Sequence, residues 1–396
     1  GQVLARAAGV HLAFFSGNEV FWKTRWENSL SSPATAYRTL VVYKETHADA
    51  KIDPTTTWTG TWRDPRFSPP SDGGRPENAL TGNIFMVNCC SAAITVPAAE
   101  GRLRFWRNTS VAGLAVGQSA TMPAGTLGYE WDEDLDNGFR PNGLIRLSDT
   151  TVSVPQKLLD YGTNYGQGTA NHALTLYRHS SGALVFGAGT VQWSWGLDGN
   201  HDRGGSVASL DMQQATVNLL ADMTVQPLTL QNGLSAAVGS TDTQAPVSQV
   251  LAPANAAIVA SNAIVTISGT AVDVAGVVGG VEVSIDNGAT WHPAVGRENW
   301  TYAWQTGSAR TVTILSRATD DSGNRGANSA PVTVAVSDSA SPCPCTVFNP
   351  TDVPTSMAVD PFSVELGMRF RSTQSGYITA VRFYKHSQNG GTHIGS

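Results

Sequence analysis

Residues 10–19 are Val10-His11-Leu12-Ala13-Phe14-Phe15-Ser16-Gly17-Asn18-Glu19, an apolar run that ends in a turn. A short run that is apolar on both faces is typical of a strand buried inside a sheet. Residues 2–8 before it have a helical pattern, and Gly9 is a suitable helix stop. Residues 20–26 after it carry two tryptophans one helical turn apart. We therefore predict the order helix, strand, turn, helix.

The same alternation continues to the end of this region. Residues 183–186 form a second apolar run, which leads into a glycine-containing loop. Ser209 is the predicted N-cap of a later helix. The apolar face of that helix is predicted to contain Met212, Ala215, Leu219 and Met223. We predict one α/β domain over residues 1–230.

The pattern changes after residue 230. Residues 231–245 are rich in Gly, Ser, Thr and Ala and predict a linker. Short alternating runs over residues 246–337, with a hairpin turn at Asp286-Asn287-Gly288, predict an immunoglobulin-like β-sandwich. A second linker at 338–345 and part of a β-rich, jelly-roll-like domain at 346–396 are expected to follow. We also expect the chain to be cut at both ends, within a helix and within a β domain.

Composition limits the classes of function. The 396 residues exceed what one core usually organises, so two or three domains are expected. The chain has 25 Lys and Arg against 31 Asp and Glu, a net charge of −6, and no basic cluster. Nucleic-acid binding needs clustered cations, so this partner is excluded. No apolar run reaches the ~18 residues that span a bilayer, so no membrane span is expected.

Four cysteines form two tight pairs, Cys89 with Cys90 and Cys343 with Cys345. Neither pair has the spacing of a zinc site. Adjacent cysteines rarely bridge each other because their side chains diverge. The pattern leaves two alternatives open, namely disulfides to other parts of the chain and buried free thiols.

Several motifs, in order, resemble the C-terminal domain of the N,N-dimethylformamidase large subunit. The motifs are Ala8 to Trp22, Trp58 to Pro65, Glu77 to Gly82 and Val191 to Asp198, and the similarity covers about residues 1–227. The resemblance implies a fold similar to class I glutamine amidotransferases, a doubly wound α/β sheet whose first strands are missing. Residues 250–337 look like a bacterial Ig-like domain. The stretch from Val364 to Lys385 is similar to a bacterial extracellular β domain of unknown function, so a secreted or cell-surface protein is expected.

The resemblance also implies an activity. Family enzymes hydrolyse the carbon–nitrogen bond of formamides at a mononuclear iron held by two tyrosines and a glutamate. The tyrosine motif is expected upstream of residue 1, so this fragment alone should be inactive. Glu77, which opens a Leu-Thr-Gly motif, is the first candidate for the iron-binding glutamate, and Glu130 is the second. A surface carboxylate without a partner is the alternative for each.

The turn after the first strand carries the next candidates. Amidotransferase-like folds present a nucleophile there, but Phe15 occupies the position that usually holds cysteine. A thiol mechanism is therefore disfavoured, and Ser16 lacks a nearby His motif and is interpreted as a turn residue. Glu19 is expected to line a pocket and is the catalytic candidate of this turn.

A glycine-flanked loop at residues 198–202 lies where open α/β sheets bind ligands. Asp198, His201 and Asp202 are therefore catalytic candidates. The oxygens at 198, 200 and 202 also suggest calcium, but the loop lacks the downstream glutamate of a helix-loop-helix site, and a polar turn is the simpler interpretation. The same ambiguity holds for Asp132, Glu133, Asp134 and Asp136, while His172 and His179 are interpreted as structural.

Four aromatics of the predicted sandwich could stack on sugar rings or form its core, namely Trp291, Trp300, Tyr302 and Trp304. The sequence thus supports two main hypotheses. The first is an amidohydrolase-like domain, using iron in the full-length protein, displayed on extracellular β modules. The second is an extracellular protein that binds a small-molecule amide or a glycan through an inactive α/β domain. A structural spacer is a third option.

Overall fold

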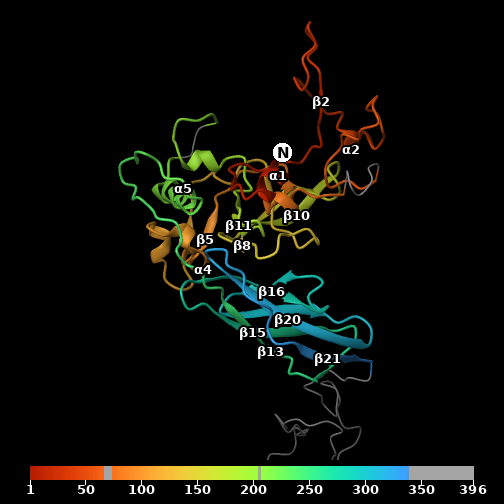
Figure 1. The fold of residues 1–396 in the computed structure, drawn as a ribbon, viewed down its shortest axis with the longest axis vertical. Coiled ribbons are helices and arrows are strands. Elements are labelled where there is room, and N and C mark those ends of the chain that lie inside the picture. The colour runs from red at the N-terminus through yellow and green to blue at the C-terminus, as the bar shows by residue number, and fades with distance from the viewer. Residues whose placement is uncertain (67–73, 204–206, 339–396) are drawn as a thin grey trace, which may run out of the picture. The chain divides into compact units, whose positions relative to one another are not determined.

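The computed structural model describes residues 1–66, 74–203 and 207–338 (Figure 1). In these ranges the chain forms 21 β-strands, five α-helices and three short 3-10 helices, so it is rich in β structure. Predictions for Cys343, Cys345 and the β domain at 346–396 lie outside the described residues. We call residues 1–245 the N-terminal part and residues 246–338 the sandwich.

The first sheet of the N-terminal part has the order β1-β12-β11-β8. Its strands are β1 (Leu12–Phe14), β12 (Leu184–Gly187), β11 (Thr175–Arg178) and β8 (Ile145–Arg146). β1 pairs in parallel with β12, and the other pairs are antiparallel. The two apolar runs are thus strands, and α1 (Gln2–Ala7) precedes β1 as predicted. The prediction that the first run is buried inside the sheet is wrong, because β1 is an edge strand whose Leu12 and Ala13 are half-buried.

The second sheet has the order β10-β9-β4-β7 and is antiparallel throughout. Its strands are β10 (Tyr165–His172), β9 (Thr150–Leu158), β4 (Ile84–Val87) and β7 (Trp131–Glu133). Two antiparallel two-stranded sheets complete the strands of this part, β2 (Arg25–Glu27) with β3 (Thr39–Val41) and β5 (Thr95–Pro97) with β6 (Ser119–Thr121). The remaining helices are α2 (Glu45–Ala48), α3 (Asn78–Thr81), α4 (Ala98–Gly101), η1 (Arg104–Trp106), η2 (Ser110–Gly113), η3 (Trp193–Gly196) and α5 (Leu210–Asp222).

The predicted doubly wound α/β sheet is not supported by this arrangement, because β1 and β12 are the one parallel pair in the described N-terminal part. The predicted helix over 20–26 is also wrong. Phe21 is buried, and its carbonyl accepts a hydrogen bond from the Trp62 amide at 3.0 Å. The Lys23 amide donates to the Gly60 carbonyl at 2.8 Å. Pairing with residues 60–62 therefore holds this segment extended, against its helical spacing.

α5 is the helix that the sequence predicted best. The Ser209 hydroxyl accepts a hydrogen bond from the Met212 amide, which caps the helix. All four predicted apolar positions of the helix join the main core of the N-terminal part, which also contains Trp106, Trp131, Phe186 and Trp193. Leu234 and Ala237 pack against the opposite face of α5, so the segment predicted as a linker is partly packed.

The sandwich consists of two sheets that share one core. One sheet contains β13 (Val247–Ala252), β15 (Ile264–Val272), β19 (Asn299–Gln305) and β18 (Val295–Gly296). The other contains β14 (Ile258–Ala260), β21 (Val332–Ser337), β20 (Arg310–Asp320), β16 (Val278–Ser284) and β17 (His292–Pro293). Asn287 and Gly288 have φ values of 59° and 89°, so the predicted hairpin turn is present. Trp300 and Trp304 are fully buried in this core.

Polar contacts join the two parts, which belong to one compact unit. The Glu282 carboxylate accepts from the Gly143 amide at 2.9 Å, and the Asp321 carboxylate accepts from the Arg104 amide at 2.7 Å. Arg297 donates to Glu100 at 3.2 Å. The sandwich is therefore fixed to the N-terminal part by charged side chains on backbone donors.

Candidate functional site

The turn after β1 meets the start of β7 at a group of carboxylates. The Asn18 backbone amide donates to Asp132 Oδ1, and the Asn18 side-chain amide donates to Glu130 Oε2, each at 2.9 Å. Asn18 has a φ of 53°, a left-handed conformation that asparagine tolerates well. One residue thus holds two carboxylates, and we call Glu19, Glu130 and Asp132 the carboxylate cluster.

Backbone contacts between the strands bring this cluster together. The parallel pairing of β1 with β12 carries the chain from Phe14 into the turn, and the Asp132 amide donates to the Gly189 carbonyl at 2.9 Å. Gly17 packs against Thr190 so closely that an added Cβ would lie 2.8 Å from the Thr190 nitrogen. Glycine is therefore required at position 17 for the turn to approach the end of β12.

Two members of the cluster have strongly shifted pKa values. Burial is the main cause that raises the pKa of Asp132 to about 7, and the charges of Glu77 and Glu19 add to it. Burial also raises the pKa of Glu19 to about 7. Glu19 Oε2 is buried and has no hydrogen-bond partner among the described residues. Both groups can therefore hold or release a proton near neutral pH.

The two predicted metal ligands lie in different environments. Glu77 is buried beside Arg63, which forms an ion pair with Glu77 Oε1 and donates to Oε2 at 3.3 Å. The Phe85 amide also donates to Glu77 Oε1 at 3.3 Å. Glu130 is half-buried, and its Oε1 makes no hydrogen bond within the part of the chain that the structure describes. Of these two glutamates, Glu130 is thus the one with an oxygen that makes no hydrogen bond among the described residues.

Tyr165 on β10 adds a phenol near the cluster. Burial raises its pKa, with Arg63 opposing and the Glu130 charge contributing to the increase. No pattern in the sequence predicted the roles of Arg63, Tyr165 and Asn18 at this site. Only the Trp58 to Pro65 motif could have drawn attention to Arg63, because the other two contacts depend on the pairing of distant strands.

The loop at residues 198–202 is mostly exposed, with hydrogen bonds within the loop and with Trp195, whose Nε1 donates to the Asp202 carbonyl at 3.1 Å. Asp198 Oδ1 accepts from the Asn200 amide at 2.8 Å, and His201 Nδ1 lies 2.8 Å from the Asp202 carbonyl oxygen. No hydrogen bond joins this loop to the carboxylate cluster in the described ranges. Arg203, just after the loop, lies 3.9 Å above the Tyr129 ring, next to Glu130. The catalytic roles of Asp198, His201 and Asp202 remain predictions.

The acidic run after Trp131 divides into separate ion pairs. Glu133 pairs with Lys157 at 2.7 Å, and Asp134 with Arg140 at 2.7 Å. Asp136 contacts His292 at 2.7 Å. These contacts favour structural roles over a shared calcium loop.

The two predicted structural histidines are engaged with the protein itself. His172 is fully buried, and burial lowers its pKa to about 4. Its Nε2 lies 2.9 Å from the Ala188 carbonyl oxygen. His179 Nδ1 lies 2.9 Å from the Ser181 hydroxyl.

In the sandwich, Trp300 and Trp304 are core residues, so they are inaccessible to sugars.

A different acidic group lies where the N-terminal part meets the sandwich. Asp242, Asp273 and Asp320 each offer an oxygen, and these oxygens lie within 4.8 Å of one another. Burial, with a contribution from Asp242, raises the pKa of Asp320 to about 6. Carboxylate oxygens are the donors that Ca²⁺ takes, whereas the tyrosine ligands implied for iron are absent from this group. No local pattern in the sequence predicts this group, because its members are far apart in the chain.

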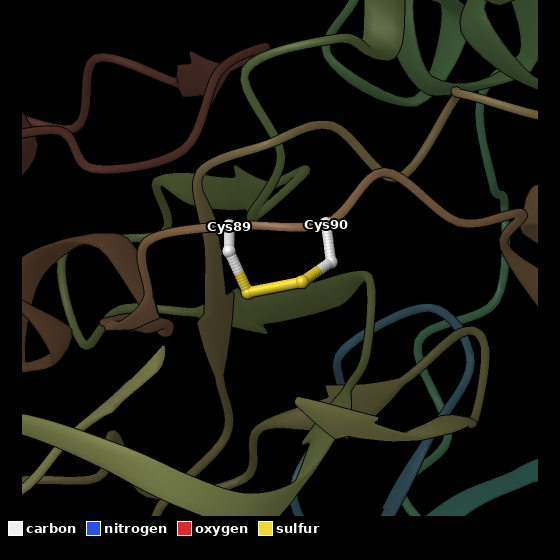
Figure 2. Close-up of a disulfide and its surroundings, with 2 residues drawn as sticks. All are labelled: Cys89 and Cys90. Atoms are coloured by element: carbon white, nitrogen blue, oxygen red, sulfur yellow. A yellow bond between two sulfur atoms is a disulfide. The ribbon is translucent and has the colours of Figure 1, made fainter. Parts of the chain in front are cut away.

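The prediction that adjacent cysteines do not bridge each other is wrong for Cys89 and Cys90. Figure 2 shows their side chains joined by a disulfide. Cys90 has a φ of 60°, an unusual conformation for this residue, and the backbone turns there. Cys89 packs against the main core of the N-terminal part.

Within residues 1–66, 74–203 and 207–338, no helix is both long and apolar enough to cross a membrane.

Comparison with solved structures gives only weak likenesses. The fibronectin(III)-like modules of Clostridium thermocellum CbhA are 18% identical over 23% of this chain and 97% of theirs, with a TM-score of 0.21. The endo-beta-1,4-mannanase of Thermotoga petrophila is 8% identical over 41% of this chain and 29% of its own, with a TM-score of 0.20. A Cellulomonas fimi endo-beta-1,4-mannanase double mutant is 23% identical over 26% of this chain and 20% of its own, with a TM-score of 0.17. This chain thus spans less than a third of either mannanase.

Comparison with curated proteins found no match. Two sequence families do match. A domain of unknown function, DUF4082, matches residues 351–396. The family described as N,N-dimethylformamidase beta subunit-like, C-terminal, matches residues 3–205, which is more than half of the chain. The chain therefore belongs to the N,N-dimethylformamidase beta subunit-like C-terminal family.

Proposed function

We propose that the N-terminal part is an amidohydrolase-like domain that, in the full-length protein, hydrolyses a carbon–nitrogen amide bond. The carboxylate cluster carries this proposal. It contains two acids with pKa values of about 7 and a half-buried glutamate with one free oxygen. All three residues lie inside the stretch that matches the family.

The cluster supports the proton transfers that amide hydrolysis needs. A proton must leave the attacking water, and a proton must reach the departing nitrogen. Glu19 and Asp132 can serve in such transfers because burial raises the pKa of each to about 7. Asn18 holds Glu130 in a fixed orientation, so that its free oxygen can face a substrate or its water.

The iron implied by the family resemblance fits Glu130 better than Glu77. Both Glu77 oxygens are occupied by Arg63 and a backbone amide, whereas Glu130 keeps one oxygen free. A hard carboxylate oxygen suits a ferric ion. When bound, the ion would supply Lewis-acid activation of the carbonyl group. We therefore propose Glu130 as this chain's ligand and Glu77 as a structural partner of Arg63.

A secreted or cell-surface location is part of the proposal. The Cys89–Cys90 disulfide supports it, because disulfides persist mainly in oxidising compartments. The carboxylate cluster itself would act in the same way in any compartment.

The test is amine release from small formamides by the full-length protein, with and without added ferrous or ferric iron. Glu130→Gln should lower kcat at least about 100-fold, and Glu77→Gln should mainly lower the folding stability. Asp49→Asn, which alters an exposed carboxylate, is the matched control and should leave both quantities unchanged. Failure of the full-length protein to hydrolyse any formamide under either condition would overturn the proposal.

A further inference from the structure

The Cys89–Cys90 disulfide lies opposite the backbone segment that carries Glu130. Val87 pairs with Trp131 at the end of β4, and the Ala92 amide donates to the Leu127 carbonyl at 2.7 Å. Residues 88–91 and residues 128–130 therefore connect the same two pairings. The disulfide is in the first connection and Glu130 is in the second.

The two cysteines differ in exposure. Cys90 is exposed, whereas Cys89 is half-buried and packs against the main core. A thiol in solution can therefore approach the residue at position 90, while the sulfur of Cys89 remains held by the protein. Disulfides that are exposed are the ones most readily reduced.

We propose that the Cys89–Cys90 disulfide is a redox-modification site that reacts with a low-molecular-weight thiol. The thiolate of the small molecule attacks the Cys90 sulfur, which forms a mixed disulfide and releases Cys89 as a thiolate that takes up a proton. A second small thiol attacks the small molecule's sulfur in the mixed disulfide, which frees Cys90 as a thiol and leaves the disulfide of the two small thiols. Two electrons and two protons pass to the protein.

Reduction of the Cys89–Cys90 disulfide increases the motion of residues 128–130, the segment opposite it. A bond between adjacent residues restricts the backbone on both sides of their shared peptide, and its reduction restores that freedom. The connection has only four residues between two fixed pairings, so the added motion reaches Leu127 and Trp131. It therefore loosens the segment that positions Glu130. The consequence for catalysis rests on the proposed function, whereas the reactivity of the disulfide and the backbone response do not.

The experiment treats the folded full-length protein with reduced glutathione and then alkylates the free thiols with iodoacetamide. Peptide mapping distinguishes Cys89 and Cys90 from the second pair. Hydrogen exchange is followed by mass spectrometry in peptides covering 88–92 and 127–131. Both thiols should be trapped without global unfolding, and exchange in both peptides should rise by about threefold or more, while α5 is unchanged.

Variants separate this site from the other cysteines. Cys89→Ser with Cys90→Ser should exchange like the reduced protein and should not respond to glutathione. Cys343→Ser with Cys345→Ser is the matched control and should keep the wild-type response. A disulfide that is reduced only after global unfolding, or a reduced protein with unchanged exchange at 127–131, would overturn the inference. If the first double variant does not fold, the wild-type response to glutathione still decides. Loss of the proposed hydrolase activity would alter none of these results.

Discussion

Buried carboxylates in the sandwich have compensating partners, whereas those in the carboxylate cluster are only partly compensated. In the sandwich, buried Glu282 pairs with Arg317 at 2.8 Å and accepts from a backbone amide of the N-terminal part. In the cluster, Glu19 has a buried oxygen without a partner, and Asp132 lies near two further acids. Uncompensated buried charge lowers stability, and it is found mainly where function requires it. The contrast thus separates a part whose buried charges are compensated from the site that we propose to be reactive.

The largest expected effect on folding stability comes from removing Arg63, the cation that pairs with buried Glu77. Arg63→Ala removes the partner of buried Glu77 and should lower the free energy of unfolding by about 3–5 kcal/mol. Chemical denaturation at neutral pH measures this change. Arg38→Ala, at an exposed position, should have no measurable effect. A loss below about 1 kcal/mol would contradict this prediction, because the buried Arg63–Glu77 ion pair would then contribute little to folding stability.

Neutralising a carboxylate in the sandwich should also destabilise the protein. Glu282→Gln weakens the ion pair with Arg317 and the contact with the Gly143 amide, and should cost about 2 kcal/mol. The measurement is thermal unfolding followed by circular dichroism. An unchanged melting temperature would contradict the comparison, because Glu282 would then contribute no more to stability than an exposed charge does.

Neutralising Glu19 in the carboxylate cluster should instead increase the folding stability. The pKa of Glu19 is raised to about 7 from an ordinary value of 4.5, so its stability contribution is complete below about pH 4.5 and is lost as the pH rises through 7. Glu19→Gln should therefore gain stability over the wild type across this range. The gain at pH 8 should be about 1 kcal/mol, because solvent screens this half-buried group. Denaturation at pH 4 and pH 8 tests the sign, and a destabilised variant at pH 8 would contradict it.

Local patterns predicted the elements that depend on local chemistry. The strands at Leu12–Phe14 and Leu184–Gly187, the cap at Ser209 and the turn at Asn287 all follow from side chains near one another in the chain. Residues 20–26 were assigned wrongly, because their hydrogen bonds go to residues 60–62, which no local spacing reveals.

The candidate site was predicted in part. Glu19 and Glu130 were selected from a turn and from a family resemblance, but their common partner Asn18 becomes visible only when β1 and β7 are placed together. The alternating acids from Asp132 to Asp136 look alike in sequence, yet Asp132 alone among them lies beside Asn18, while Asp134 and Asp136 pair with basic side chains. Burial, which shifts the pKa of Asp132, is a property of the folded chain.

The hydrogen bond from the Gly143 amide to Glu282 also determines where the gene can usefully be shortened. A truncation near residue 245 would leave the amides of Gly143 and Arg104 without their acceptors and would expose the surface that the β16 strand covers. Expression of the first 245 residues alone should therefore give a protein that unfolds at a lower temperature than the chain that includes the sandwich. An expressed chain that ends after residue 338 retains both acceptors, Glu282 and Asp321.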